Sequence, residues 1–445
     1  MEKILEKIKR AVPARLLSAL SPPWHFLLAL CAAFRYGFPA RTIRVIGVTG
    51  TKGKTTTVHL IHEILAESGA KVASASSVRF KIGERETQND LKMTMPGRFF
   101  TQKFLRDTAR AGCRYAVLEV TSQGIAQYRH RWIRFHAAVM TNVASEHLES
   151  HGGFEKYLRA KLDLFWRLPQ DSVAVINRDD PSWQRFSAAT PARKMFYQKT
   201  GIERDNAARQ ISDVALTDRG ISFRLGDTLI TSPLPGEFNF YNILAAVSVG
   251  LALYIAPERI ASAVARVAGV PGRMEFVRRD PFAVVVDYAH TPDSLKAVYV
   301  FLKENQKPKT KNQKLICVFG AAGGGRDKWK RPEFAKIAEQ FCAEIILTDE
   351  DPYDENPESI LDDIQAGFSS RFLQSKMSRI LDRRAAIREA INRAQSGDAV
   401  IITGKGAEPW IMGPAGSKIP WDDRAVVREE IQATGQESDK KLDRK

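Results

Sequence analysis

The sequence predicts an α/β protein: a doubly wound central domain of the P-loop type, followed by a second Rossmann-like α/β domain. The main observation is that short apolar, β-branched runs alternate with helical patterns along the chain. In the first series, strands are expected at 45–49, 115–120, 137–142 and 173–177, and helices at 54–68, 98–111 and 154–167. This order is typical of a mostly parallel sheet, which binds ligands beyond the carboxyl ends of its strands.

A second series of the same kind predicts the second domain. Its strands are expected at 283–287, 315–319, 344–348 and 399–403. A Pro/Gly cluster at 267–273 separates the two series, and residues 211–232 alternate like antiparallel strands around a turn at 218–220. The predicted organisation is a short helical segment (1–44), a central domain (45–268), a C-terminal domain (269–430) and a charged tail, expected to be disordered (431–445).

Residues 45–57, VIGVTGTKGKTTT, carry the strongest functional signal. An apolar strand turns through Gly47, Gly50 and Gly53 and enters a helix, so backbone N–H groups and a helix N-terminus can face an anion. The usual P-loop spelling has Gly where Val48 stands, but the strand before and the helix after give the expected context. The alternative is an ordinary strand-to-helix turn. We predict that ATP is bound by Gly50, Thr51, Lys52, Gly53, Lys54, Thr55 and Thr56.

Within this loop, Lys54 can reach the terminal phosphates, and the Thr55 hydroxyl can bind Mg²⁺. The strand at 115–120 ends in Glu119, and a carboxylate opposite a phosphate loop is a usual Mg²⁺ ligand. The alternative for Glu119 is a surface glutamate at a strand end. After the next strand, His147 and His151 stand four residues apart, but a zinc-protease H-E-x-x-H order is absent.

Three stretches of the sequence together resemble the Mur ligase family: the phosphate loop, the Glu-Val-Thr-Ser run at 119–122 and residues 141–152. Members of that family use the cleavage of ATP to form amide bonds in peptidoglycan synthesis. The resemblance continues through 91–98, 236–242, 286–293 (VDYAHTPD), the Gly-rich run at 319–332 and 403–408 (TGKGAE). It covers roughly residues 44–410.

The resemblance implies roles for particular residues. As catalytic groups it implies Lys54, Glu119, His147 and Lys161, and as Mg²⁺ ligands Thr55, Glu119, His147 and Lys161, the last as carbamyl-lysine. It adds Asn242, Arg273 and Asp287 to the ATP site. For the substrates it implies Thr94, Pro96, Ser122, His290, Asp351, Tyr353, Lys405 and Glu408. Taken without the resemblance, Lys161 is one lysine on a helix, Asn239 and Asn242 are helix caps, and 91–98 is a plain turn.

The resemblance also implies the reaction, with ATP and Mg²⁺ as cofactors. An acceptor carboxylate attacks the γ-phosphorus to give an acyl phosphate and ADP, and an amino acid amine then displaces phosphate. The implied partners are ATP, a muramoyl-peptide acceptor and an amino acid. The same chemistry on a folylpolyglutamate- or cyanophycin-like polymer is the alternative. A third alternative is a non-enzymatic subunit that binds ATP. The presence of all four implied Mg²⁺ ligands, Thr55, Glu119, His147 and Lys161, argues against it.

Two departures from the family pattern bear on the substrates. Members of the family carry a uridine-binding domain before the phosphate loop, whereas residues 1–44 show no βαβ pattern. Members that add diaminopimelate have Asp-Asn-Pro-Arg where residues 350–353 read Glu-Asp-Pro-Tyr. Tyr353 cannot form a bidentate ion pair with a carboxylate, and the local acidity suits an amine. We therefore predict an added amino acid with a cationic or neutral side chain.

Composition gives weaker expectations. The formal net charge is +16, and because no nucleic-acid-binding signature accompanies it, anionic small molecules are expected rather than nucleic acid. Cys31, Cys113, Cys317 and Cys342 form no C-x-x-C pair, which predicts free thiols in a reducing compartment and a cytoplasmic protein. We expect a monomer.

The amino-terminal segment combines a basic amphipathic stretch at 1–10 with an apolar run at 24–34. The run is shorter than the roughly 20 residues needed to span a bilayer. The pattern favours a helix packed on the next domain over an interfacial membrane helix, and peripheral membrane contact of residues 1–40 stays open.

Overall fold

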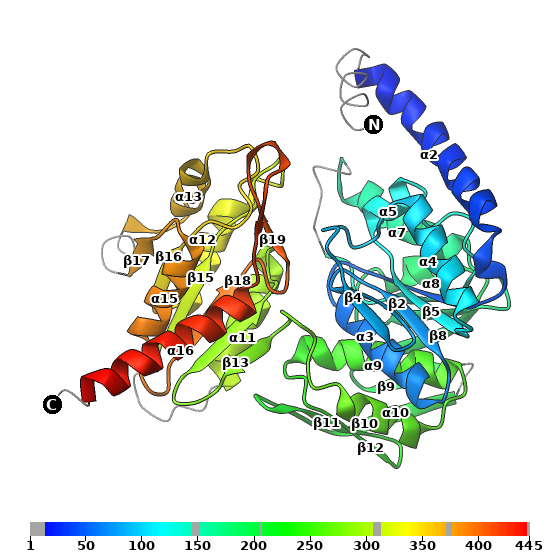
Figure 1. Cartoon of the computed structure of the whole chain (residues 1–445). Coiled ribbons are helices and arrows are strands. Elements are labelled where there is room, and N and C mark those ends of the chain that lie inside the picture. Colours follow the sequence, from blue (N-terminus) through cyan, green and yellow to red (C-terminus); the bar gives the residue numbers. More distant parts are fainter. Residues whose placement is uncertain (1–13, 145–151, 205–206, 306–312, 371–375, 443–445) are drawn as a thin grey trace.

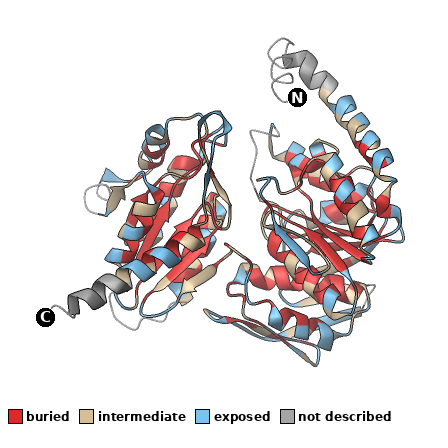
Figure 2. Ribbon diagram, in the orientation of Figure 1, coloured by how far each residue is buried: buried red, intermediate tan, exposed pale blue. Residues whose placement is uncertain are grey.

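A computed structural model of the protein describes residues 14–144, 152–204, 207–305, 313–370 and 376–442. Figure 1 shows two α/β units side by side, with the amino-terminal helix α2 (Ala14–Tyr36) running along the first. The first unit holds a 12-stranded sheet and the second a 6-stranded sheet. The central strands of both sheets lie between layers of helices, and Figure 2 shows that these central strands are buried.

The centre of the first sheet is parallel, with strand order β2-β5-β1-β6-β7-β8. These strands are β1 (Arg44–Thr49), β2 (Val72–Ala75), β5 (Tyr115–Glu119), β6 (Phe135–Met140), β7 (Val173–Asn177) and β8 (Arg193–Gln198). The predicted doubly wound arrangement is confirmed, and the strands β2 and β8 join it without having been predicted. Because these strands are parallel, their carboxyl ends meet at one edge of the sheet.

Antiparallel strands extend the sheet at both sides. On one side are β3 (Arg79–Ile82) and β4 (Arg85–Gln88), and on the other β9 (Gly201–Arg204), β10 (Ala207–Thr217), β11 (Gly220–Leu225) and β12 (Thr228–Ser232). The antiparallel strands predicted at 211–232 are thus confirmed, with the turn between β10 and β11.

Alternating side chains of the parallel strands pack into two hydrophobic cores, one on each face of the sheet. In β1, Ile46 and Val48 face one core and Val45 faces the other, as the period of two in a strand requires. The first core is closed by α3 (Lys54–Glu67), α9 (Glu237–Ala252) and α10 (Pro257–Arg266). The second is closed by α4 (Arg98–Arg110), α5 (Ser122–Ala126), α7 (Phe154–Trp166) and α8 (Trp183–Ala188).

The second unit repeats the layered design on a smaller scale. Its strand order is β13-β14-β18-β15-β16-β17, and every pair except β13 with β14 is parallel. The strands are β13 (Glu275–Arg278), β14 (Ala283–Asp287), β15 (Leu315–Phe319), β16 (Glu344–Leu347), β17 (Met377–Arg379) and β18 (Ala399–Thr403). One face is covered by α11 (Pro292–Asn305), α12 (Lys330–Phe341) and α13 (Pro357–Gln365), the other by α15 (Arg383–Arg393) and α16 (Asp423–Leu442).

Short elements complete the description: the 3₁₀ turns η1 (Pro39–Arg41) and η2 (Pro414–Gly416), and a hairpin of β19 (Trp410–Met412) and β20 (Lys418–Pro420). Helix α2 packs on α4, and its Ala29, Ala32 and Ala33 are buried, which confirms the predicted packing of this segment on the central domain. Within the described residues, no helix is long and apolar enough to cross a membrane.

Two sequence-based expectations are wrong in this structure. Cys317 and Cys342 form a disulfide, because the end of α12 lies beside β15, a proximity that a separation of 25 positions in the sequence does not reveal. Only Cys31 and Cys113 are free. The tail expected to be disordered from 431 onward is helical as far as Leu442, because Val426 and Val427 anchor α16 on the sheet and the helix continues from there.

A buried ion pair holds α16 in place. Arg383 and Asp423 are almost fully buried and form two hydrogen bonds of 2.8 Å, one from Nε and one from Nη2. Arg383 Nη2 also donates to the Thr403 carbonyl oxygen at the end of β18. The pair therefore joins α15, α16 and the central strand of the sheet.

We expect Asp423→Asn to lower the free energy of unfolding of the second unit by about 3–5 kcal/mol, because it leaves the Arg383 charge buried without its partner. Urea unfolding followed by circular dichroism would measure this. The control is Glu429→Gln, which breaks the exposed pair of Glu429 with Arg384 and should cost no more than about 1 kcal/mol. Equal losses in both variants would contradict this account of α16.

Candidate active site

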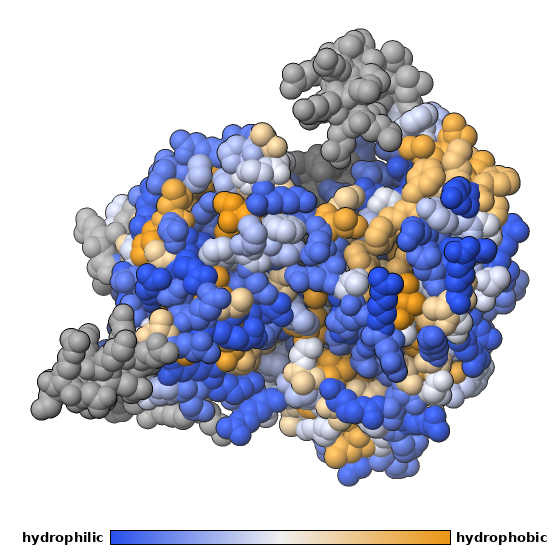
Figure 3. Space-filling model, in the orientation of Figure 1, coloured by the Kyte–Doolittle hydropathy of each residue, from blue (hydrophilic) through white to orange (hydrophobic). Residues whose placement is uncertain are grey.

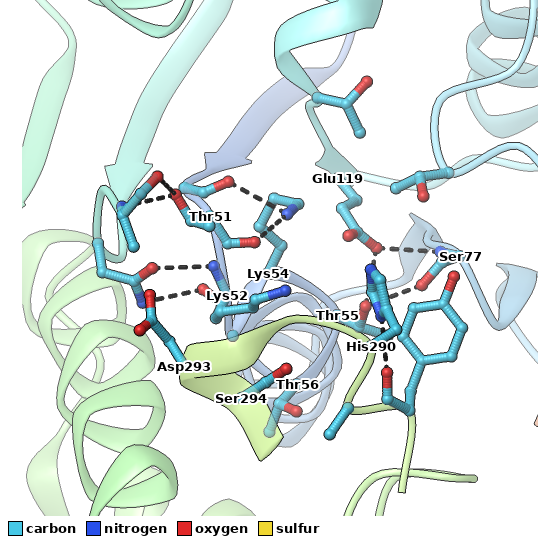
Figure 4. A pocket seen from close by; sticks show the side chains of 18 of the residues that line it. Thr51, Lys52, Lys54, Thr55, Thr56, Ser77, Glu119, His290, Asp293 and Ser294 are labelled. Atoms are coloured by element: carbon cyan, nitrogen blue, oxygen red, sulfur yellow. Dashed lines mark hydrogen bonds between the residues drawn. The ribbon is translucent and has the colours of Figure 1, made fainter. Parts of the chain in front are cut away.

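A cavity of about 710 Å³ lies between the two units, at the carboxyl ends of β1, β5, β6 and β14. Figure 4 shows that side chains of both units point into it. The predicted site residues that line it are Gly50, Thr51, Lys52, Gly53, Lys54, Thr55, Thr56, Thr94, Glu119, Ser122, Lys161, Asn242, Arg273, Asp287, His290, Asp351, Tyr353 and Glu408. Residues from both halves of the chain therefore converge on one space.

Three predicted residues are not in this set. Pro96 lines a small neighbouring pocket, and its carbonyl oxygen accepts a hydrogen bond from Thr101. Lys405 is completely buried behind the cavity wall. His147, together with Glu146 and His151, lies outside the described residues.

The phosphate-binding loop is braced by Asn142, which follows β6. The Thr51 amide donates to the Asn142 carbonyl oxygen (2.8 Å), and the Lys52 amide donates to Asn142 Oδ1 (2.9 Å). Asn142 Nδ2 in turn donates to the Lys52 carbonyl oxygen (3.1 Å). These contacts fix the loop from outside, so its remaining amides are free to face an anion at the start of α3.

Gly53, which precedes α3, has no room for a side chain. Its φ is +82°, and a Cβ there would stand 2.1 Å from Asn242 Oδ1. Asn239 and Asn242 lie inside α9, whose N-cap is Gly236, so the helix-cap reading of these two residues is wrong. The Asn239 side chain donates to the Pro235 carbonyl oxygen, and Asn242 donates to Asn239 (3.1 Å).

Two lysines meet at the loop. Lys54 Nζ donates to the carbonyl oxygens of Gly50 (3.1 Å) and Thr51 (2.8 Å). Lys161 reaches the same loop from α7: its Nζ is 2.6 Å from the Gly50 carbonyl oxygen and 4.5 Å from the centre of the Tyr157 ring. Without the family resemblance, the sequence did not predict that Lys161 lies at this loop. The structure shows that it does.

Oxygen atoms suited to a hard cation gather at the end of β5. Thr55 Oγ1 donates to Glu119 Oε2 (3.1 Å), and both side chains are buried. The Ser77 amide also donates to Glu119 Oε2 (3.0 Å), and its hydroxyl lies 2.9 Å from Thr55 Oγ1. A hydroxyl and one carboxylate beside a phosphate loop fit Mg²⁺, which keeps several water and phosphate ligands. No group of three or more His, Cys, Asp or Glu side chains forms a metal cluster in the part of the chain that the structure describes.

The second unit contributes a rigid set around Asp287. Asp287 accepts hydrogen bonds from the amides of Met274 (2.6 Å) and Ala289 (2.7 Å), and burial raises the pKa of this carboxyl although the Arg273 charge opposes the rise. The Arg273 guanidinium lies over the Tyr288 ring at 4.1 Å and reaches to 3.5 Å from Thr55 Oγ1. His290 Nδ1 donates to the Tyr288 carbonyl oxygen at 2.7 Å. Arg273 thus connects the second unit to the candidate Mg²⁺ ligand.

Four charged groups form an ionic cluster across the two units, which we call the bridging cluster: Lys92, Asp351, Lys405 and Glu408. Lys405 Nζ lies 2.8 Å from Asp351 Oδ1 and 2.7 Å from Glu408 Oε2. Lys92, from the loop before α4, lies 2.7 Å from Asp351 Oδ2 and 3.1 Å from Glu408 Oε2. Burial opposes the charge of Glu408, yet the two ammonium groups lower its pKa to about 2. Lys405 therefore positions the carboxylates.

The Gly-rich run at 322–325 is explained by close packing. A Cβ at Gly323 would stand 2.3 Å from the Pro352 carbonyl oxygen, and one at Gly324 would stand 2.7 Å from the Tyr353 ring. The run carries Arg326 into the cavity, where it hydrogen-bonds Tyr353. The glycines thus let Arg326 and Tyr353 share one wall of the site.

Sequence reasoning did not identify several residues that line the cavity: Ser77, Lys92, Arg129, Tyr288 and Arg326. Arg129 is held by Gln127 Oε1 and by a short hydrogen bond to the Met95 carbonyl oxygen. Burial, together with the nearby Arg98 charge, lowers its pKa. Arg129 stands seven residues after Ser122 and next to a buried histidine, and nothing in this stretch of sequence indicated a site residue. Arg326 and Tyr288 lie within motifs already noted and could have been included.

The fold and the cavity define a two-domain α/β enzyme that binds nucleotide phosphates between its domains. Residues 48–250 match the Mur ligase middle domain, and residues 272–406 match the Mur ligase glutamate ligase domain. The chain is 41% identical over 411 residues to the UDP-N-acetylmuramoyl-L-alanyl-D-glutamate–2,6-diaminopimelate ligase of Gloeobacter violaceus, with 91% of this chain and 80% of that protein covered. It is 39% identical over 438 residues to the UDP-N-acetylmuramyl-tripeptide synthetase of Roseiflexus sp., covering 92% and 82%.

Solved structures agree with these relatives. A UDP-N-acetylmuramoyl-L-alanyl-D-glutamate–2,6-diaminopimelate ligase structure matches with a TM-score of 0.60 at 33% identity, covering 88% of this chain and 79% of that one. A Mycobacterium tuberculosis folylpolyglutamate synthase matches with a TM-score of 0.67 at 18% identity, covering 85% and 92%, and so shares the fold. The chain belongs to the Mur ligase family, as the motifs indicated, and it is an ATP-dependent acid–amino-acid ligase. The reading as a non-enzymatic subunit is not retained.

We expect Gly53→Ala to weaken ATP binding about tenfold or more, because the added methyl group forces the loop away from Asn242 and strains a left-handed backbone. Isothermal titration with a non-hydrolysable ATP analogue would measure the affinity.

Gly69→Ala is the matched control, because Gly69 has a similar φ of +86° and a Cβ there meets nothing within 4 Å. It should bind the analogue as tightly as the unmodified protein. Unchanged affinity of Gly53→Ala would contradict the placement of ATP on this loop.

Proposed function

We propose that the protein joins an amino acid to the carboxylate of a peptidoglycan-precursor muramoyl peptide, cleaving ATP to ADP and phosphate through an acyl phosphate. The observation that carries this proposal is the single cavity, which has a phosphate loop on one side and a set of paired charges on the other. Both sides come from one chain, so we also propose a monomer, and we place it in the cytoplasm because ATP is its substrate.

The charges of the cavity suit phosphoryl transfer between two anions. Lys52, Lys54 and the loop amides surround the place expected for the terminal phosphates, and Arg273 approaches from the second unit. These cations spread the negative charge that develops in the transfer. Arg129 and Ser122 line the cavity near Thr94, where an acceptor carboxylate would meet both a cation and hydroxyl groups.

Mg²⁺ would be held by Thr55 and Glu119, and when bound it neutralises charge on the phosphate oxygens. We further propose that Lys161 carries a carbamate and, with His147, ligands a second Mg²⁺. In support, Lys161 is buried and reaches the phosphate loop, where an added carboxylate would stand beside the phosphates. Its amine would add CO₂ and release one proton.

Carbamylation is tested by ¹³C NMR of the protein in ¹³C-bicarbonate. We expect one slowly exchanging carbamate signal that disappears in Lys161→Arg and persists in Lys156→Arg, an exposed lysine on the same helix. Lys161→Arg should also lose most ligase activity. Absence of the signal in the active, unmodified protein would rule out the carbamate.

For the amino acid, we propose a cationic side chain, with lysine as the leading candidate. Asp351 and Glu408 line the cavity and share the Lys92 ammonium, and the side-chain ammonium of the amino acid would take the place of Lys92 between them. Tyr353 lies in the same wall and offers no bidentate partner for the distal carboxylate of diaminopimelate. Some relatives are named as diaminopimelate ligases, and we expect this chain to differ from them at residue 353.

We expect turnover with lysine to exceed turnover with diaminopimelate, and Tyr353→Arg to shift the ratio of kcat/KM toward diaminopimelate by about tenfold or more, the effect of one good charged pair. Tyr353→Phe is the matched control and should keep the preference. Faster turnover of the unmodified enzyme with diaminopimelate would overturn this proposal.

The whole proposal is tested by ADP release with Mg²⁺-ATP, UDP-N-acetylmuramoyl-L-alanyl-D-glutamate and a panel of amino acids. We expect release that depends on both the acceptor and one amino acid, and that is lost in Lys54→Met. Release that instead requires a folate or a poly-carboxylate polymer would favour the alternative acceptor class, which shares the fold.

A further inference from the structure

The amino-terminal helix α2 presents an apolar stripe that nothing in the described structure covers. Trp24, Leu27 and Phe34 are 54%, 50% and 69% exposed, and Cys31 is exposed between them. At 3.6 residues per turn, these four positions fall within about 80° of the helix circumference. Ala29, Ala32 and Ala33, which are buried, lie on the opposite side. Figure 3 shows this apolar surface along α2, at the upper right of the molecule.

The stripe continues onto the neighbouring loop through stacked aromatic rings. The ring of Phe34 packs on Phe38 (5.2 Å between centroids), and Phe38 packs on Trp132 (6.3 Å), which is itself 40% exposed. Phe26 on α2 contacts Trp132 and Tyr128. Because these contacts tie α2 to the first unit, the exposed apolar side chains are held at the surface rather than free to fold inward.

The amino-terminal sequence is strongly basic. Residues 1–44 contain two acidic residues, Glu2 and Glu6, and eight basic ones: Lys3, Lys7, Lys9, Arg10, Arg15, Arg35, Arg41 and Arg44. No acidic residue occurs within α2 itself. Arg35 and Arg41 are exposed at its carboxyl end. An apolar face with aromatic anchors and a basic border is the pattern of a helix that lies in the interface of an anionic bilayer.

We propose that α2 docks the enzyme on the surface of an anionic lipid membrane, through Trp24, Leu27 and Phe34 together with Arg35 and Arg41. The occupant is a lipid surface rather than a protein, because an apolar stripe beside exposed arginines complements lipid acyl chains and acidic headgroups together. The inference goes beyond the ligase reaction and does not depend on which acceptor is used.

Docking in this way would bring one side of the active site close to the lipid. His25, on the inner side of α2, lies near Arg98 and Arg129, and these charges add to burial in lowering its pKa. Arg129 lines the cavity between the two units. The membrane-facing helix and the cavity wall are therefore neighbours.

Flotation of the full-length protein with vesicles tests the proposal. We expect binding to vesicles of phosphatidylglycerol and phosphatidylcholine, weak binding to phosphatidylcholine alone, and a loss of at least tenfold in affinity for Trp24→Ser/Leu27→Ser/Phe34→Ser. Arg35→Glu/Arg41→Glu should weaken binding to the anionic vesicles and reduce its salt dependence, because fewer cations then face the acidic headgroups. The matched control is Val214→Ser/Leu216→Ser/Leu229→Ser, which removes exposed apolar side chains on β10 and β12 and should bind normally.

Thermal unfolding and ADP release of each variant show that it is folded, and neither should change, because none of these residues lines the cavity. Two results would overturn the proposal: no binding of the unmodified protein to anionic vesicles at low salt, or equal binding of the α2 triple variant. A dimer in light scattering that the triple variant abolishes would assign the stripe to a second copy instead.

Discussion

The rest of the site depends on the way Asn142 holds the phosphate-binding loop. A loop of this kind binds phosphate only if its backbone amides stay aligned, and a chain of glycines cannot align them alone. Here the main chain and side chain of Asn142 pair with Thr51 and Lys52, while Asn242 closes the space beside Gly53. The order of the parallel strands makes this possible, because β6 is the direct neighbour of β1 and its carboxyl end emerges beside the loop.

The second constraint is that the site is complete only where two units meet. The phosphate loop, Glu119 and Lys161 belong to the first unit, whereas Arg273, Asp287 and Tyr353 belong to the second. The bridging cluster links them, since Lys92 of the first unit pairs with Asp351 and Glu408 of the second. A reaction that first activates a carboxylate and then admits an amine benefits from such an arrangement, because closure can exclude water from the acyl phosphate.

The sequence predicted those features that local chemistry specifies. The runs that form β1, β5 and β15 are apolar and β-branched, and the glycines before α3 indicated the phosphate loop, so the fold class and the loop residues of the cavity followed. Lys92 and Arg129 could not be predicted, because their positions depend on the path of loops and on the angle between the units. The pairing of Cys317 with Cys342 likewise depends on where α12 ends. His147 lies outside the described residues, so its predicted role stays a prediction.

The central claim is that the cavity transfers the γ-phosphoryl group of ATP directly to the acceptor carboxylate. The most direct test uses an acceptor with both carboxylate oxygens labelled as ¹⁸O, followed by mass spectrometry of the phosphate that is released. The account predicts one ¹⁸O in each phosphate, because an acyl phosphate leaves with an oxygen of the acceptor. Unlabelled phosphate, formed at the same rate as the amide product, would contradict it.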